Sequence, residues 1–262
     1  DKKIWILLLV LFLSLVLSYF MRTKRKFKIV GRDIHVEVKI GNILNMSGDI
    51  VIPSNTTFDT SFEQDIISLN SIQGQFTKKY FSDNIKQLDE KINTSLNDKK
   101  NKNTDKEYVK DKKKGKKYKY DYGTTIKLEL TDKKVAYFVA ISEMNNDCVA
   151  STDSEKLLES LLKLWDTIAN KGSKNTINIP LIGTGCGRIT EGREVIAKLI
   201  VDSLITALST GNSFLSQLNI IIYPNDLLLH EIDVNGLCDF IKFHCDNFEY
   251  NSTNKKIGTG II

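Results

Sequence analysis

The stretch that most constrains the fold is residues 177–189, which read Ile-Asn-Ile-Pro-Leu-Ile-Gly-Thr-Gly-Cys-Gly-Arg-Ile. Apolar residues through Ile182 have the pattern of a short buried strand, and three glycines alternating with Thr184 and Cys186 then end it. A helical pattern follows. Glycine permits close backbone approach, and the first turn of a helix offers unpaired N–H groups with partial positive charge. The stretch therefore predicts either a phosphate-binding loop or only a tight connection between strand and helix.

A nearly continuous apolar run occupies residues 4–21. As a helix it would span about 27 Å at ~1.5 Å per residue, against a hydrocarbon core of ~30 Å. A secretory signal peptide is the alternative, because Lys2 and Lys3 precede the run, but no small-x-small cleavage site follows it. The pattern predicts a retained N-terminal transmembrane helix, with residues 1–26 forming the anchor and a basic juxtamembrane segment.

Positive charge flanks this run unevenly. Five cations in residues 22–28 outnumber Lys2 and Lys3, so the positive-inside tendency predicts that the rest of the chain is cytoplasmic. The chain does not begin with Met, and a preceding helix that completes a membrane hairpin would be compatible with the same orientation.

The charge of the remaining chain excludes one class of partner. Residues 99–119 carry eleven Lys against three acids, a net charge of +8, and residues 22–28 add +5, whereas the whole chain carries only +5. Everything else therefore has a net charge of −8, which argues against a broad nucleic-acid surface. Residues 95–119 contain almost no apolar side chains, so we expect a solvated, disordered insertion. The two basic stretches favour contact with anionic lipid headgroups.

Cysteine and histidine spacing indicates neither disulfides nor a metal site. No Cys-x-x-Cys pair is present, which is typical of a reduced cytosolic domain, and the histidines lack metal-ligand spacing. These residues are Cys148, Cys186, Cys238, Cys245, His35, His230 and His244. We also propose no nucleophile at Cys186, because no neighbouring residue would lower the pKa of its thiol.

Hydrophobic periodicity alternates between strands and helices. The predicted strands are residues 34–40, 49–53, 124–130, 135–141, 177–182 and 218–223, and the predicted helices are residues 71–84, 152–169, 191–208 and 234–244. Residues 152–155 read as a capping box for the second helix. This order predicts an α/β fold, a three-layer sandwich with a mixed central sheet, followed by a C-terminal tail at residues 249–262.

Polar and aromatic residues follow four of these strands. Asn42, Asn55, the glycine loop and Tyr223 each come directly after a strand, and ligands of open α/β sheets bind beyond the carboxyl ends of strands. The amides suit a base and a ribose, the glycine loop suits a diphosphate, and the aromatic ring suits base stacking. Each residue taken singly has an alternative role without a ligand. Asn55 can form hydrogen bonds within its own turn, and Tyr223 can pack at the edge of the core.

At these positions the sequence resembles the macro domain family, whose members bind ADP-ribose. Gly41-Asn42-Ile43 is similar to the family's Gly-Asp-Ile motif, and residues 50–55 to its Ile-Val-Asn-Ala-Ala-Asn segment. Residues 179–188 resemble its phosphate-binding loop. The resemblance covers residues 27–248 apart from the lysine-rich run. The ligand contacts that it implies are Asn42, Ile43, Asn55, Phe58, Asp59, Gly183, Thr184, Gly185, Cys186, Gly187, Arg188 and Tyr223.

Two positions depart from the family pattern. Asn42 replaces the acid that accepts from the adenine amino group, so the hydrogen bond carries no charge and the preference for adenine is expected to be weaker. Residues 57–62 replace a poly-glycine loop that leads to catalytic groups in hydrolytic members. In this bulkier loop, Asp59 either contacts the distal ribose or caps a turn, and Phe58 and Phe62 either cover the ligand or fill the core.

A narrower resemblance is to the macro domain of the membrane-anchored Thoeris antiphage effectors. The segments that carry it are residues 49–53, 58–60, 70–76, 122–124, 158–165, 179–185 and 222–224. The resemblance implies transmembrane helices before a macro domain in the bacterial inner membrane. It also implies an NAD-derived signal made by a partner TIR-domain protein, with histidine-linked ADP-ribose as the ligand.

Three functions remain open at this point. The first is a membrane-tethered, homo-oligomeric sensor whose macro domain binds ADP-ribose or a conjugate and triggers membrane disruption; it needs no catalytic residue, metal or cofactor. The second is a macro-type ADP-ribosyl hydrolase, in which a water held by ribose and phosphate would be the only route, because no nucleophilic constellation is present. The third is an interaction protein that uses the lysine run to bind anionic lipid or nucleic acid.

Overall fold

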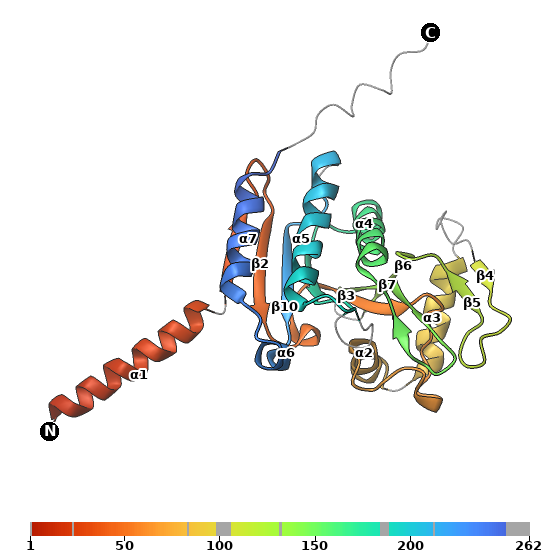
Figure 1. Cartoon of the computed structure of the whole chain (residues 1–262), viewed down its shortest axis with the longest axis horizontal. Coiled ribbons are helices and arrows are strands. Elements are labelled where there is room, and N and C mark those ends of the chain that lie inside the picture. The colour runs from red at the N-terminus through yellow and green to blue at the C-terminus, as the bar shows by residue number, and fades with distance from the viewer. Residues whose placement is uncertain are drawn as a thin grey trace, which may run out of the picture.

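The computed structural model describes residues 2–22, 24–82, 84–97, 106–130, 133–183, 189–211 and 213–249. At its centre lies a sheet with the strand order β1-β2-β10-β9-β3-β7-β6, in which β8 pairs with β7 (Figure 1). The strands of this sheet are β1 (Lys24–Lys28), β2 (His35–Ile40), β3 (Asp49–Asn55), β6 (Thr125–Glu129), β7 (Val135–Met144), β8 (Ala150–Ser151), β9 (Thr176–Pro180) and β10 (Gln217–Ile222).

The middle of the sheet is parallel and its edges are antiparallel. The five middle strands, β2, β10, β9, β3 and β7, run parallel to one another. The edge strands differ: β1 pairs antiparallel with β2, and β6 pairs antiparallel with β7. The predicted α/β fold with a mixed sheet is confirmed. Because the middle strands share one direction, their carboxyl ends all meet at one edge of the sheet.

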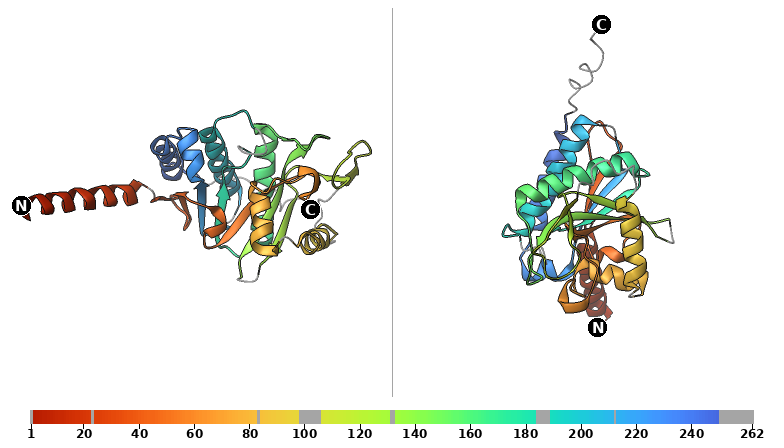
Figure 2. Two further views of the ribbon diagram at one scale, coloured as in Figure 1. Left: turned by 90° about the horizontal axis from the view of Figure 1, so that it is seen from below. Right: turned by 90° about the vertical axis from the view of Figure 1, so that its right-hand side faces the viewer.

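Helices cover both faces of this sheet, in three layers (Figure 2). Side chains alternate along each strand, so Val51 joins the core beneath α4 (Ser154–Lys171), α5 (Arg193–Thr210) and α7 (Val234–Asp246). Its neighbours Ile50 and Ile52 join the opposite core, beneath α2 (Ile72–Phe81) and α3 (Ile85–Asn97). Parallel strands need this cover on both faces.

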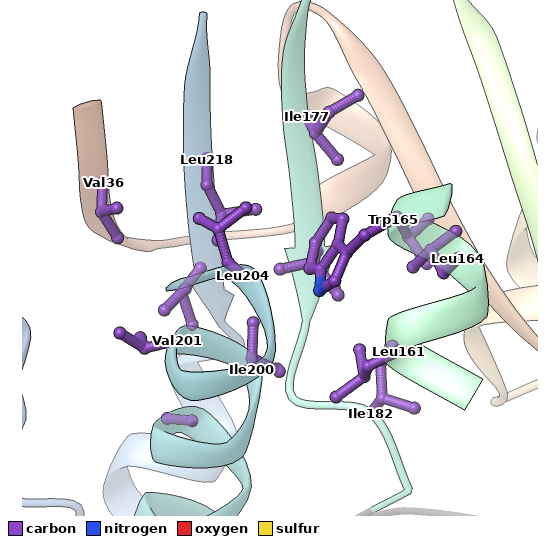
Figure 3. Packing of buried hydrophobic residues seen from close by; sticks show 14 of the residues in the cluster. Val36, Leu161, Leu164, Trp165, Ile177, Ile182, Ile200, Val201, Leu204 and Leu218 are labelled. Atoms are coloured by element: carbon purple, nitrogen blue, oxygen red, sulfur yellow. The ribbon is translucent and has the colours of Figure 1, made fainter. Parts of the chain in front are cut away.

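The larger core is built where α4 and α5 lie against β9 and β10. Figure 3 shows side chains of both helices directed at these strands. The indole of Trp165 is fully buried, and its Nε1 donates a hydrogen bond to Ser203 Oγ of α5 at 2.8 Å. A buried polar atom on each helix is thus satisfied by the other. The residues labelled in Figure 3 are Val36, Leu161, Leu164, Trp165, Ile177, Ile182, Ile200, Val201, Leu204 and Leu218.

On the opposite face of β9 and β10, two buried asparagines form a polar ladder. Asn219 lies beside Asn178 in register, and its Nδ2 donates to Asn178 Oδ1 at 2.8 Å. Asn178 Nδ2 in turn donates to the carbonyls of Ser47 and Asp49 at 2.8 and 2.9 Å. Every amide in this chain of contacts therefore has a partner, as burial requires.

Helix ends differ by a few residues from the prediction. The predicted helix starts at residue 152, whereas α4 begins at Ser154. Asp153 is the N-cap of α4, and its side chain accepts a hydrogen bond from the N–H of Lys156. This hydrogen bond is also the main cause that lowers the pKa of the Asp153 carboxyl. α5 begins at Arg193 after Gly192, and residues 224–229 form the short helix α6 (Pro224–Leu229), which was not predicted.

The prediction of a disordered insertion at residues 95–119 is wrong where the structure describes that segment. α3, which the sequence analysis missed, extends to Asn97, and β4 (Lys106–Tyr108) pairs antiparallel with β5 (Tyr118–Tyr120). The hairpin folds onto the domain because the Lys112 ammonium, only 6% exposed, forms an ion pair with buried Asp59. Part of the predicted C-terminal tail, residues 250–262, lies outside the described residues.

At the N-terminus, helix α1 (Lys2–Arg22) extends away from the sheet (Figures 1 and 2). Its large apolar side chains in residues 4–15 are between 48% and 74% exposed. Among the described residues, no helix combines the length and apolar character that a membrane crossing needs. The basic residues after α1, expected as a juxtamembrane segment, form the edge strand β1.

Two adjacent leucines of α4 provide a matched test of the larger core. Leu161→Ala should lower the free energy of unfolding by about 2–5 kcal/mol, because this side chain is 1% exposed and its removal leaves a cavity. Leu162→Ala, at a side chain 37% exposed, should change it by less than about 1 kcal/mol. Urea denaturation followed by circular dichroism measures both, and equal losses would contradict this packing.

Candidate functional site

A cavity of about 440 Å³ opens where the parallel strands end. Residues at or just beyond the carboxyl ends of β2, β3, β7, β9 and β10 form its floor, and residues 65–75, leading into α2, form one wall. The lining includes Gly41, Asn42, Ile43, Ser54, Asn55, Gln73, Ser142, Met144, Cys148, Pro180, Gly183 and Tyr223. The topology thus brings together residues that are almost two hundred positions apart in the sequence.

At one end of the cavity, Asn42 caps a single turn of 3-10 helix, η1 (Ile43–Asn45). Asn42 Oδ1 accepts from the Leu44 N–H at 2.9 Å, which fixes the orientation of the amide. Ile43 is 4% exposed and contributes an apolar surface beside it. Because an amide oxygen has two lone pairs, Asn42 Oδ1 keeps one for a ligand.

Asn55 lies at the end of β3, where the register with β7 shifts between Ser54 and Asn55. The Asn55 side chain is 4% exposed and lines the cavity. Its Oδ1 accepts from the Asp59 N–H at 3.0 Å, and its Nδ2 donates to Asp59 Oδ2 at 3.0 Å. The loop that follows β3 therefore fixes the amide from both sides.

Phe58 and Asp59, which the resemblance places at the ligand, lie in this loop, and neither belongs to the described residues that line the cavity. Phe58 belongs to the smaller core and contacts Tyr120 edge to face, with ring centroids 5.8 Å apart. Its φ of 49° is unusual for an aromatic residue and indicates that packing holds the loop in place. Asp59 is 1% exposed, and its carboxylate faces Lys112.

The predicted phosphate loop begins at Gly183 and is closed at its base. Gly183 has a φ of 84°, a left-handed conformation that favours glycine, and its carbonyl accepts from the Ile189 N–H at 3.1 Å. The segment between these two residues thus starts and ends at the carboxyl end of β9. Thr184, Gly185, Cys186, Gly187 and Arg188 lie outside the described residues, so their predicted phosphate contacts stay predictions.

A second contact holds the flank of this loop. The Ser154 hydroxyl at the start of α4 donates to the Glu191 carboxylate, and this hydrogen bond is the main cause that lowers the pKa of Glu191. Nearby, the Thr152 methyl group lies close to Gly183. Two segments that follow different strands therefore meet at the base of the predicted phosphate loop.

Tyr223 directly follows β10, as the N-cap of α6, and lines the cavity. The residue is 46% exposed, so a ligand can reach it. Asp226, one turn further in α6, also lines the cavity, and its carboxylate pairs with Arg193 at the start of α5 at 3.0 Å. This ion pair ties the first turn of α5 to α6, which directly follows Tyr223.

Several lining residues were not predicted from the sequence. Ser54 is 4% exposed, and its hydroxyl has no hydrogen-bond partner within the described part of the chain. Ser54 and Asn55 both come directly after the predicted strand at residues 49–53. The rule that ligands bind beyond the carboxyl ends of strands therefore points to both residues. Gln73 and Met144 gave no comparable signal, because one lies within a helix and the other at the end of a strand whose last residues look ordinary.

The site is rich in amides, hydroxyls and apolar surface. Across the described residues, no group of three or more His, Cys, Asp or Glu side chains is placed to hold a metal ion. Such a lining suits a neutral or anionic ligand that has hydroxyls and an aromatic base.

Comparison with known sequences identifies related proteins. The family model described as Thoeris protein ThsA, Macro domain, matches residues 36–223. The Thoeris protein ThsA of Bacillus amyloliquefaciens (strain Y2) is 27% identical over 214 residues, covering 77% of this chain and 69% of the relative. The matched region contains all the strands that line the cavity.

Solved structures share the fold at low sequence identity. A macrodomain mutant from Oceanobacillus iheyensis superposes with a TM-score of 0.54 and 15% identity, covering 83% of this chain and 98% of the other. A Trypanosoma brucei macrodomain in complex with ADP-ribose gives a TM-score of 0.50 at 10% identity, covering 78% of this chain and 72% of the other. These likenesses establish the macro fold.

Two glycines near the predicted phosphate loop provide a test of its base. Gly183→Ala should lower the free energy of unfolding by about 1–2 kcal/mol, because alanine is strained at a φ of 84° and its Cβ would meet Ile189. Gly192→Ala should have a smaller effect, since Gly192 has a φ of −62° and open space around it. Thermal and urea unfolding measure the stability of both variants. A larger loss of stability in Gly192→Ala would contradict the left-handed turn at Gly183 that packs against Ile189.

Proposed function

This chain belongs to the Thoeris ThsA macro domain family, and we propose that it is a sensor whose cavity binds ADP-ribose or an ADP-ribose conjugate. The observation that carries the proposal is the position of Asn42, Asn55, Gly183 and Tyr223 around one cavity at the carboxyl ends of the parallel strands. The Trypanosoma brucei macrodomain, which shares the fold, is in complex with ADP-ribose.

Each part of such a ligand has a matching group. Asn42 Oδ1 would accept from the adenine amino group, Tyr223 would stack on the base, and Asn55 would contact the distal ribose. The diphosphate would bind to the predicted loop 184–188, which begins directly after Gly183. Uncharged amides at both ends favour binding of neutral groups by hydrogen bonds rather than by ion pairing.

We propose binding without turnover, with hydrolysis of ADP-ribosyl conjugates as the alternative. Phe58 and Asp59 replace the flexible first loop of hydrolytic members with a segment whose carboxylate is already engaged by Lys112. Incubating the chain with the ligand and separating the products by chromatography distinguishes the two functions.

The sensor proposal includes the N-terminal helix. β1 pairs antiparallel with β2, so Lys24 faces Lys39 near the carboxyl end of β2, two residues before Gly41. Because α1 precedes β1, it leaves the domain at the edge that carries the cavity. A ligand that favours one arrangement of this edge would therefore bias the position of α1.

The biological setting remains part of the proposal. The signal would be NAD-derived, made by a TIR-domain partner, and histidine-linked ADP-ribose is one candidate. α1 would associate with the inner membrane, with the macro domain in the cytoplasm, and ligand-bound homo-oligomers would disrupt the bilayer. Leakage of a dye from vesicles containing the full chain, on addition of ADP-ribose or its conjugates, tests this last step.

Two half-exposed tyrosines allow a controlled binding experiment. In calorimetric titrations of the full chain with ADP-ribose, Tyr223→Ala should weaken binding by about 5- to 100-fold, because a stacked aromatic contributes about 1–3 kcal/mol. Tyr118→Ala, at a ring 49% exposed on the β4–β5 hairpin, should leave the affinity unchanged. Absence of binding by the wild-type chain to ADP-ribose and to its amino-acid conjugates would rule out the proposed ligand class.

A further inference from the structure

The carboxylate of Asp59 is the centre of a buried network outside the cavity lining. Lys112 Nζ lies 2.5 Å from Asp59 Oδ2, and these side chains are 6% and 1% exposed. The same ammonium donates to Thr57 Oγ1 at 2.7 Å and to the Lys116 carbonyl at 2.9 Å. All three protons of the ammonium are therefore used within the fold.

The turn from Lys112 to Lys116, hereafter the strap, wraps around this carboxylate. The Lys116 N–H donates to Asp59 Oδ1 at 2.5 Å, and Gly115 lies so close that a Cβ there would meet the carboxylate. Gly115 also has a φ of 75°, so glycine is needed for both the turn and the close approach. Lys116 Nζ further donates to the Phe58 carbonyl at 2.7 Å.

This network determines what Asn55 can offer to a ligand. The Thr57 hydroxyl lies 2.6 Å from Asp59 Oδ2 and 3.2 Å from Asn55 Oδ1, so its single proton is best placed for Asp59. Asn55 then keeps one lone pair on Oδ1 and one N–H on Nδ2, because Asp59 takes the others. Among the described residues, the remaining N–H has only Met144 Sδ within hydrogen-bond distance, at 3.8 Å, a weak acceptor that a ligand would replace.

The strap also contacts the turn between β7 and β8, which contributes residues to the cavity lining. The Lys113 N–H donates to Asn146 Oδ1 at 2.9 Å. Asn146 lies in the turn between β7 and β8, between the lining residues Met144 and Cys148. The strap therefore connects the loop after β3 to the turn after β7, the two segments that border Asn55.

We propose that Lys112 is a positioning residue that acts through Asp59 to hold Asn55 ready for a hydroxyl of the ligand, and that the strap thereby selects ligands with a distal ribose. This inference rests on the proposed function. One donor and one acceptor at Asn55 match the hydroxyl groups of a ribose. Without Lys112, Asp59 would be a buried unpaired charge, and the loop would rearrange to reach water, moving Asn55 with it.

Two nucleotides that differ in the distal ribose test this role. In calorimetric titrations of the full chain, Lys112→Met should weaken binding of ADP-ribose by about tenfold or more, the loss of one good hydrogen bond, with ADP binding unchanged. Lys110→Met removes the same charge from an exposed side chain of the same hairpin, outside the strap, and should leave both affinities as in the wild type. Unchanged ADP-ribose binding in Lys112→Met, or equal losses for both nucleotides, would overturn the inference.

A second variant covers the case in which Lys112→Met does not fold. The double variant Lys112→Met with Asp59→Asn removes both buried charges, which proteins often tolerate, and it should show the same selective loss of ADP-ribose binding. Wild-type affinity for ADP-ribose in this double variant would overturn the positioning role. A wild-type chain that binds neither of these nucleotides nor an amino-acid conjugate of ADP-ribose would instead refute the proposed function itself.

Discussion

The parallel direction of the middle strands is the constraint on which the rest of the structure depends. Parallel strands need connections that cross a face of the sheet, so α4 and α5 are placed over the strands that precede and follow them. The same direction brings the ends of β2, β3, β7, β9 and β10 to one edge, where the backbone turns away and polar groups can face a shared space. The cavity is therefore a consequence of topology, and the residues that follow each strand decide its chemistry.

Much of this architecture could be predicted from local sequence, because strand and helix periodicity is a local property. The alternation of apolar and polar residues at 34–40 and the spacing of apolar residues in α4 and α5 were sufficient to predict the layers. α3 was missed although Leu88, Ile92 and Leu96 recur every fourth residue, since the neighbouring lysine run dominated the interpretation. Asn42, Asn55 and Tyr223 were found by a positional rule, and the structure places all three in the lining.

Lys112 could not have been found in this way. Nothing in the local sequence separates it from Lys113 and Lys114, and its burial depends on Asp59, 53 residues away. Likewise, Asp59 was considered as a ligand contact or a turn cap, whereas its partner comes from a hairpin that composition alone described as solvated. Composition predicts the average environment of a lysine, but one long-range ion pair decides the environment of this one.

The amide ladder of Asn178 and Asn219 has a consequence for strand alignment. On their other face, β9 and β10 carry only apolar side chains into the larger core. Sliding one strand by a single residue would turn its asparagine into that core and leave the other amide without its partner. Hydrophobic contacts alone would tolerate several alignments of two isoleucine-rich strands. The ladder makes the other alignments unfavourable. It therefore fixes the register of β9 against β10, and with it the relative positions of Gly183 and Tyr223, which follow the two strands.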